Sequence, residues 1–225
     1  FVDSDDTLRK GAVEALLSKA VETNADIVQG GFVNITGHGL VFGRTGYREG
    51  SAAETGQTPY GMAWGKVIRS SIFAHLKFPE GYWFEDTIFA FCIAPFRPAH
   101  YLIPAYVYNY TRNPLGITLR SRKKAKAVDT VWIMRYLMAD LAQKKEVRSA
   151  QVQQLLLQHI ALAWYRLSRL DETVQQAAFL VMQQMYAAYY APQDICVQDS
   201  RLLALHQALA AKNYGQYLAA AENLA

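Results

Sequence analysis

The chain begins with Phe1-Val2-Asp3-Ser4-Asp5-Asp6, in which two apolar residues run directly into three carboxylates. This order predicts the end of a buried strand, because α/β sheets place ligand-binding side chains where a strand ends before a helix. Asp3 and Asp5 fall on one side of an extended segment, so both are candidate oxygen ligands for one Mg²⁺ or Mn²⁺ ion. Three carboxylates in four residues repel each other unless a cation is near. A helix-capping acidic turn without metal is the alternative.

The spacing of apolar residues predicts the elements that follow this acidic turn. A helix is expected over residues 8–21, with Asp5 or Asp6 as its N-cap. A short buried strand is expected over residues 25–28, ending at Gly30-Gly31.

Glycine and aromatic residues indicate a hairpin and a pair of strands further along. Gly37-His38-Gly39 punctuates the hairpin. A helix is expected over residues 85–95, followed by strands over 101–103 and 105–110. The second of these strands is expected to carry three alternating tyrosines on one side, Tyr106, Tyr108 and Tyr110.

The chain of 225 residues changes character near residues 119–125. We expect an α/β domain over residues 1–119 and an all-α helical domain over residues 120–225, where helical periodicity dominates. The helical part is expected to hold helices at 123–146, 149–168, 171–190, 199–211 and 213–223. Its aromatic and sulfur-containing side chains are expected to pack between helices: Trp132, Met134, Met138, Trp164, Met182 and Met185.

Positive charge is concentrated in the second part. Residues 120–225 carry 13 Lys and Arg against 8 Asp and Glu, whereas residues 1–119 carry 10 against 11. The densest cluster is Arg120, Arg122, Lys123, Lys124 and Lys126. Such a cluster can meet the phosphates of a nucleic acid or of a membrane surface. A solvated turn at the start of a helix is the alternative.

Composition excludes several classes of protein. With 52% apolar and 19% charged residues, the chain has a globular balance rather than a disordered one. No run of uncharged apolar residues is long enough for a membrane span. Cys92 and Cys196 lie too far apart for a disulfide framework or a zinc site, so a reducing, cytoplasmic location is expected.

A second acidic motif, Glu85-Asp86, follows the Gly-containing aromatic stretch from Phe78 to Phe84. Adjacent carboxylates at the start of a helix suit a general base and a neighbour that orients it. A helix N-terminus favours the ionised carboxylate, which is ready to accept a proton at neutral pH. A helix-capping pair is the alternative.

A third candidate is Trp64-Gly65-Lys66, with Arg69 close behind. A lysine near an acidic metal site can bind a phosphate or a carboxylate, and Trp64 can stack on a sugar face. A surface lysine beside a packed tryptophan is the alternative.

Taken in chain order, these motifs resemble the family 2 glycosyltransferases of the GT-A type, especially bacterial enzymes of capsule, lipopolysaccharide and exopolysaccharide assembly. The resemblance covers residues 1–119, and the ordered combination is far more specific than any single motif. Its motifs are Phe1-Val2-Asp3-Ser4-Asp5-Asp6, Ala25-Asp26-Ile27-Val28, Trp64-Gly65-Lys66-Val67-Ile68-Arg69, Phe78-Pro79-Glu80-Gly81, Glu85-Asp86-Thr87, Tyr106-Val107-Tyr108 and Gly116-Ile117-Thr118.

The resemblance implies a fold, partners and residue roles. The fold is the C-terminal half of a Rossmann-like GT-A domain, and the partners are a nucleotide-diphosphate sugar donor and a saccharide or lipid-linked acceptor, with no nucleic acid. Asp5 resembles the ligand of a divalent metal, Mn or Mg, and Asp3 the residue near the nucleotide ribose or the metal. Asp86 resembles the catalytic base of an inverting transfer. Three further residues resemble the substrate side of the site: Trp64, Lys66 and Glu85.

The chain departs from the family pattern at three places. Val67-Ile68 replaces the usual Leu-Tyr, and Gly116 stands where the family has serine. Family members also carry a nucleotide-binding half of several βα units before the acidic motif. We therefore expect this chain to be a C-terminal portion that binds donor poorly by itself.

Two interpretations of other classes stay open. A haloacid dehalogenase-like Mg-dependent phosphatase also opens with an apolar strand and Asp-x-Asp-x-Thr, which would make Asp3 the nucleophile. Alternatively, the helical part is a non-catalytic module that binds a partner or the inner face of the cell membrane through the basic cluster at 120–126. A calcium-binding loop is excluded, because Leu8 occupies the position that requires glycine.

Overall fold

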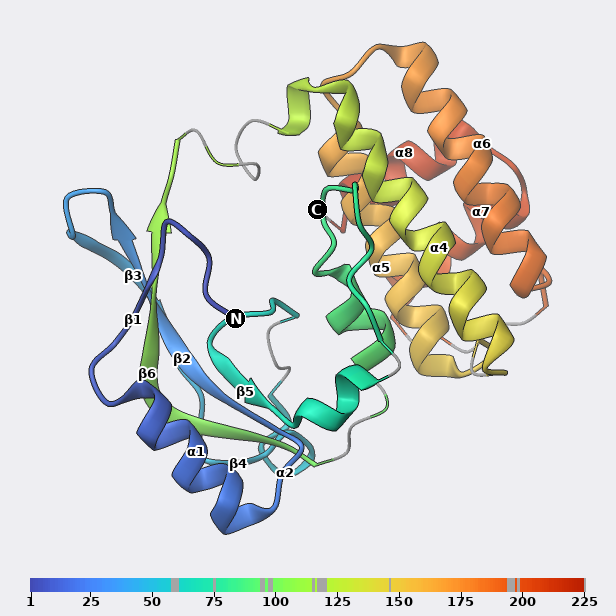
Figure 1. Cartoon of the computed structure of the whole chain (residues 1–225). Coiled ribbons are helices and arrows are strands. Elements are labelled where there is room, and N and C mark those ends of the chain that lie inside the picture. Colours follow the sequence, from blue (N-terminus) through green and yellow to red (C-terminus); the bar gives the residue numbers. More distant parts are fainter. Residues whose placement is uncertain are drawn as a thin grey trace. The chain divides into compact units, whose positions relative to one another are not determined.

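The computed structural model describes residues 1–57, 61–74, 76–93, 96, 99–114, 116, 121–145, 147–193, 197 and 199–224. The fold is mixed α/β and divides into two compact units (Figure 1). The sheet unit consists of Phe1–Phe78 and Asp86–Gly116, and the helical unit of Pro79–Glu85 and Ile117–Ala225. No helix in the described ranges has the length and apolar character needed to cross a membrane.

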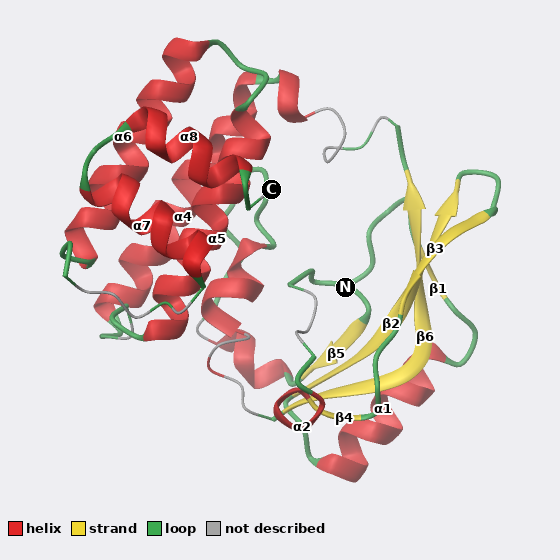
Figure 2. Ribbon diagram, turned by 180° about the vertical axis from the view of Figure 1, so that it is seen from behind, coloured by secondary structure: helices red, strands yellow, loops and turns green. Residues whose placement is uncertain are grey.

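The sheet unit is built on a mixed sheet whose central strands are β2 and β6 (Figure 2). These two strands run parallel, while each of the other strand pairs in the sheet is antiparallel. The main strand order is β1-β6-β2-β3, with β4 paired to β6 and β5 paired to β2. The strands are β1 (Thr7–Leu8), β2 (Ile27–Thr36), β3 (Val41–Thr45), β4 (Gly50–Ser51), β5 (Lys66–Ile68) and β6 (His100–Arg112).

Strand β2 continues through Gly30-Gly31, so the prediction that it ends there is wrong. A Cβ on Gly30 would lie 2.6 Å from a methyl of Val107, and one on Gly31 would lie 2.6 Å from the carbonyl oxygen of Thr45. The two glycines therefore allow the neighbouring strands to approach closely, rather than marking a turn. The predicted hairpin at residues 37–39 is confirmed as the turn between β2 and β3.

Strand β6 is one continuous strand where two were predicted, and it is irregular opposite Gly30 and Gly31. Because of this irregularity, Tyr106 pairs with Gly31 and Tyr108 with Phe32. Tyr106 is 38% exposed, whereas Tyr108 is completely buried. The prediction that both tyrosines share one side is therefore wrong, since a bulge changes the alternation of side chains.

Helix α1 (Ala12–Thr23) covers one face of the sheet (Figure 1). Its N-cap is Gly11 in the left-handed conformation, so the prediction of Asp5 or Asp6 as N-cap is wrong. Residues Thr7–Leu8 instead form β1 and pair with β6. The core of this face consists of Ala12, Leu16, Ala25, Val28, Phe32, Trp64, Ile103, Val107 and Tyr108.

The remaining helical turns of the sheet unit are short. In the described ranges they include α2 (Ala52–Thr55), η1 (Ser70–Ala74) and η2 (Phe89–Ile93), a π-helical turn. The helix predicted over residues 85–95 begins later than expected, after Asp86. Residues 94 and 95 lie outside the described part of the chain.

Four helices of the helical unit lie within one residue of their predicted bounds, whereas the helix predicted over residues 123–146 begins only at Asp129 and ends at Gln143. The helices of this unit are α4 (Asp129–Gln143), α5 (Ala150–Leu167), α6 (Glu172–Tyr189), α7 (Ser200–Ala210) and α8 (Tyr214–Glu222), preceded by the turns η4 (Ser121–Lys123) and η5 (Ala125–Val128). Helix α5 contacts α4, α6, α7 and α8. The four predicted core methionines are buried, but Trp132 is 40% exposed. Side-chain caps begin four of the helices: Ser149, Asp171, Asp199 and Asn213.

Candidate functional site

The acidic turn is fastened to the end of β6. The backbone N–H of Asp3 donates to the hydroxyl of Tyr108 at 2.9 Å, and the backbone N–H of Thr111 donates to Asp6 Oδ1 at 2.6 Å. The side-chain amide of Asn113 donates to Asp5 Oδ2 at 2.8 Å. These three bonds hold Asp3, Asp5 and Asp6 in place, although only the next two residues, Thr7 and Leu8, belong to a strand.

The three carboxylates of the turn have different surroundings. Asp6 is buried, whereas Asp3 and Asp5 are exposed. Burial raises the pKa of Asp6, although hydrogen bonds from Thr111 and Tyr108 oppose this. Asp6 is therefore a structural carboxylate, and Asp3 and Asp5 are the two that a ligand can reach.

Asp3 and Asp5 suit a cation that is held together with substrate phosphates. The described residues contain no group of three or more His, Cys, Asp or Glu side chains arranged around a metal. Mg²⁺ is commonly bound by one or two carboxylates, with the other ligands coming from phosphates and water. The exposed oxygens of this turn fit that donor set rather than a closed protein cage.

Trp64 lies inside an aromatic stack and is only 7% exposed. Its ring is parallel to that of Tyr108 at 4.5 Å, and it is also stacked on Tyr110 at 5.5 Å. Phe32 meets it edge-on at 4.9 Å. Trp64 therefore packs in the core, as the alternative reading of the sequence predicted. Its ring supports Tyr108, whose hydroxyl accepts the backbone N–H of Asp3.

Lys66 begins β5 and is buried, so the alternative of a surface lysine is wrong. It lies opposite Gln29 of β2, and its Nζ is 5.5 Å from the ring centroid of Phe89. Burial lowers the pKa of Lys66 to about 7, while the negative charge of Asp86 acts in the opposite direction. The structure thus brings two residues of separate sequence motifs, Lys66 and Asp86, within electrostatic reach of each other.

Two buried polar side chains near Lys66 were missed by the sequence reasoning. Gln29 donates to the hydroxyl of Tyr47 at 2.8 Å. His100 pairs with Ile27, two residues before Gln29, so both side chains share the sheet face of Lys66. Burial, together with the charge of Lys66, lowers the pKa of His100 to about 3, which keeps its imidazole neutral. The available signal was Gln29, a polar residue that directly follows the apolar pair Ile27-Val28.

Asp86 is half-buried, and its carbonyl accepts the backbone N–H of Phe89 at 2.9 Å. Phe89 belongs to an aromatic cluster with Phe1, Phe73 and Phe78, whose ring centroids lie 5.2–6.3 Å apart. Phe1 lies two residues before Asp3 in the sequence. The cluster therefore connects the segment of Asp86 to the segment of Asp3 and Asp5 within the sheet unit.

Glu85 is exposed and ends the segment Pro79–Glu85 of the helical unit. The domain boundary expected near residue 119 placed this segment with the first domain. In the structure the segment groups with the helices instead, because its hydrogen bonds are made to residues 126 and 129.

The structure describes some, but not all, of the other residues that the sequence motifs contain. Lys123 and Lys124 are exposed, and Lys126 donates to the carbonyl of Gly81. Gly116 donates its N–H to the carbonyl of Asn113, the residue that holds Asp5. Four residues of the sequence arguments lie outside the described part of the chain: Ile117, Thr118, Arg120 and Cys196.

The buried lysine predicts a pH dependence of stability. Its pKa is about 7 in the folded state and 10.5 in the unfolded reference, so the unfolded chain binds more protons between these values. Stability should therefore rise with pH across this window, by about 1.4 kcal/mol per pH unit at most. We expect Lys66→Met to remove this rise and to stabilise the protein at pH 7. Urea unfolding of both proteins at pH 7, 8 and 9 measures it, and parallel curves would contradict the buried charge.

Comparison with known proteins gives a structural likeness only. No protein-family model matches the chain, and neither does any curated protein. S. aureus TarS (residues 1–349) in complex with UDP-GlcNAc is similar at a TM-score of 0.71 and 16% identity, covering 99% of this chain and 66% of that one. A second structure of S. aureus TarS 1–349 gives a TM-score of 0.66 and 15% identity, covering 99% and 65%. The chain thus spans about two thirds of the length of these neighbours and shares their fold.

Proposed function

We propose that the chain belongs to a metal-dependent, inverting glycosyltransferase of the GT-A type and family 2. It would move a sugar from a nucleotide-diphosphate sugar to a hydroxyl of a saccharide or lipid-linked acceptor. One observation carries the proposal: within the sheet unit the ring of Phe1, which precedes the exposed Asp3 and Asp5 in the sequence, contacts the ring of Phe89, which follows Asp86 by three residues. The likeness to TarS, which was solved with UDP-GlcNAc, supports a nucleotide-sugar donor.

In this mechanism Asp86 is the general base. Its carboxylate accepts the proton of the acceptor hydroxyl while the acceptor oxygen attacks the anomeric carbon, and the nucleoside diphosphate departs from the opposite side. Asp5 and Asp3 would hold a Mn²⁺ or Mg²⁺ ion, which supplies neutralisation of the charge on the diphosphate. Glu85, the exposed neighbour of Asp86, is proposed to contact substrate.

Lys66 is proposed to support this chemistry from behind the site. Lys66 is buried, and its charge interacts with that of Asp86. Because its pKa is about 7, the charged and neutral forms of Lys66 are both populated at neutral pH. A positive Lys66 and an ionised Asp86 stabilise each other. Because the side chain is buried, we place it beside the base rather than in direct contact with a phosphate.

An assay of nucleoside-diphosphate release tests the function in the intact protein. The protein is incubated with Mn²⁺ and a panel of nucleotide-diphosphate sugars, UDP-GlcNAc included, with and without oligosaccharide and lipid-linked acceptors. We expect release that depends on both acceptor and metal. Hydrolysis of simple phosphate monoesters with a phosphoenzyme on Asp3 would instead indicate the phosphatase. Anionic vesicle binding that collapses with salt, without any turnover, would indicate a membrane-binding module.

A further inference from the structure

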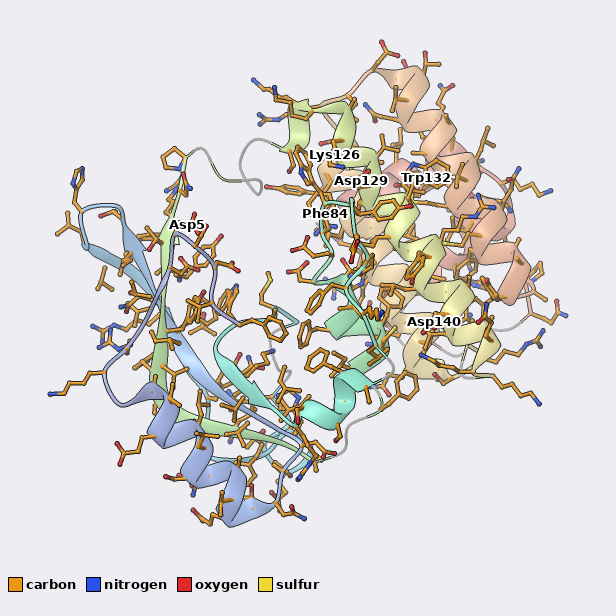
Figure 3. The ribbon with its side chains drawn as sticks, in the orientation of Figure 1. Asp5, Phe84, Lys126, Asp129, Trp132 and Asp140 are labelled. Atoms are coloured by element: carbon orange, nitrogen blue, oxygen red, sulfur yellow. The ribbon has the colours of Figure 1, made fainter. Side chains whose placement is uncertain are left out.

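One buried tyrosine of the sheet unit holds the acidic turn in place. The hydroxyl of Tyr108 in β6 accepts the backbone N–H of Asp3 at 2.9 Å, and it also interacts with the carboxylate of Asp6. The backbone N–H of Asp6 donates to the carbonyl of Asp3 at 3.1 Å, which closes the turn. Asp5 lies in this turn, beside the end of β6 (Figure 3). Tyr108 therefore contacts the turn on both sides of Asp5.

Stacking on Trp64 fixes the ring that carries this hydroxyl. The rings of Trp64 and Tyr108 lie 9° from parallel, and their centroids are 4.5 Å apart. Phe32 meets Trp64 edge-on, and all three residues belong to the core that α1 covers. The phenolic oxygen is attached rigidly to its ring, so a ring held in a packed core leaves this oxygen little freedom to move. The core of the sheet unit therefore determines where the acceptor of the Asp3 N–H lies.

We propose that Tyr108 is a positioning residue for the candidate metal ligands Asp3 and Asp5. Two carboxylates that share a cation repel each other until it binds, so a turn fixed in advance binds the cation more tightly than one that must first be ordered. Loss of a group that orients metal ligands commonly lowers metal affinity by about 10- to 100-fold. The inference rests on the metal-binding part of the proposed function. Trp64 then acts on the turn through Tyr108, instead of stacking on a sugar.

Strand β6 offers a matched control for the Tyr108 hydroxyl. Tyr110 lies two residues further along the strand and also stacks on Trp64, at 5.5 Å. Tyr108→Phe and Tyr110→Phe each keep the ring and remove one oxygen atom, but the first removes the acceptor of the Asp3 N–H. Both are made in the intact protein, together with Asp5→Ala and the double variant Tyr108→Phe/Asp5→Ala. Electron paramagnetic resonance measures the Kd of Mn²⁺ alone, amide hydrogen exchange at Asp3 follows the bond, and thermal unfolding checks that each variant is folded.

Tyr108→Phe should speed hydrogen exchange at Asp3 and raise the Kd of Mn²⁺ by about 10-fold. Tyr110→Phe should behave as the wild type in both measurements. In the Asp5→Ala background, Tyr108→Phe should change the Kd by less than about two-fold, because no complete pair of ligands remains to be positioned. A general effect on the structure would act equally in both backgrounds, so this double-mutant cycle distinguishes it from positioning.

The outcomes separate this inference from the proposed function. A wild type that transfers sugar, but in which Tyr108→Phe and Tyr110→Phe have the same Kd for Mn²⁺, would overturn the positioning role and leave the function standing. An equal change of Kd in both backgrounds would overturn the positioning role as well. A wild type that transfers no sugar, yet binds Mn²⁺ more weakly as Tyr108→Phe, would remove the proposed function and support the positioning role. A wild type that binds no Mn²⁺ would overturn both.

Discussion

Asp86→Asn in the intact protein should abolish sugar transfer, lowering kcat by about 10³-fold or more. Asparagine has nearly the same shape as aspartate but cannot accept the acceptor's proton. The half-buried position of Asp86, beside the buried Lys66, should tolerate this change without loss of the fold. The measurement is the steady-state rate of nucleoside-diphosphate release at saturating donor and acceptor.

Donor binding should remain in this variant, which distinguishes a lost base from a damaged site. We expect the Kd of the nucleotide-sugar, measured by calorimetry, to stay within about two-fold of wild type, a change of about 0.4 kcal/mol. Glu80→Gln is a suitable control, because Glu80 is an exposed carboxylate of the same sequence stretch and should have wild-type kcat. Turnover within tenfold of wild type in Asp86→Asn would remove Asp86 from the role of base.

Asp5→Ala should act on binding rather than on the chemical step. The exposed carboxylate is the candidate ligand of the cation that is shared with the diphosphate, so its loss should raise the donor Kd by about 10- to 100-fold when Mn²⁺ is present. With the metal chelated, wild type and variant should bind the donor equally weakly. Calorimetric titration of donor over a series of Mn²⁺ concentrations measures both effects.

The bond from Asn113 to Asp5 offers a graded version of this test. Asn113→Ala leaves the carboxylate in place but removes the amide that holds its Oδ2, so a smaller loss of affinity in the same direction is expected. Glu14→Gln is the control, because Glu14 is exposed on α1 and lies outside the acidic turn. Identical metal dependence in wild type and Asp5→Ala would contradict the assignment of Asp5 as a ligand.

The helices of the second part could be predicted from sequence because their determinants are local. Apolar residues recur at helical spacing, and four of the helices begin at Ser, Asp or Asn residues that cap them. The predicted bounds of α5 to α8 consequently lie within one residue of those observed. The strands of the sheet were harder to predict from the sequence. Gly30-Gly31 has the composition of a turn, and only the close approach of β6 and β3 explains why the strand continues through it.

The site shows the same division between local and distant determinants. The acidic turn and the Glu85-Asp86 pair are visible as motifs, because their chemistry is carried by neighbouring residues. The burial of Lys66 and its coupling to Asp86 could not be predicted, since they depend on a sheet face formed by three strands. The attachment of Pro79–Glu85 to the helices was also hidden, because Asp129 lies 46 residues beyond Trp83.

The most direct test of the account follows the anomeric proton by NMR while the intact protein turns over donor, acceptor and Mn²⁺. A single displacement with Asp86 as base requires that the product first appears with the anomeric configuration opposite to that of the donor. The account predicts this inverted product, formed in step with nucleoside diphosphate. A product that first appears with the donor's own configuration would contradict the proposed mechanism, and hydrolysed phosphate without any transferred sugar would contradict the proposed function.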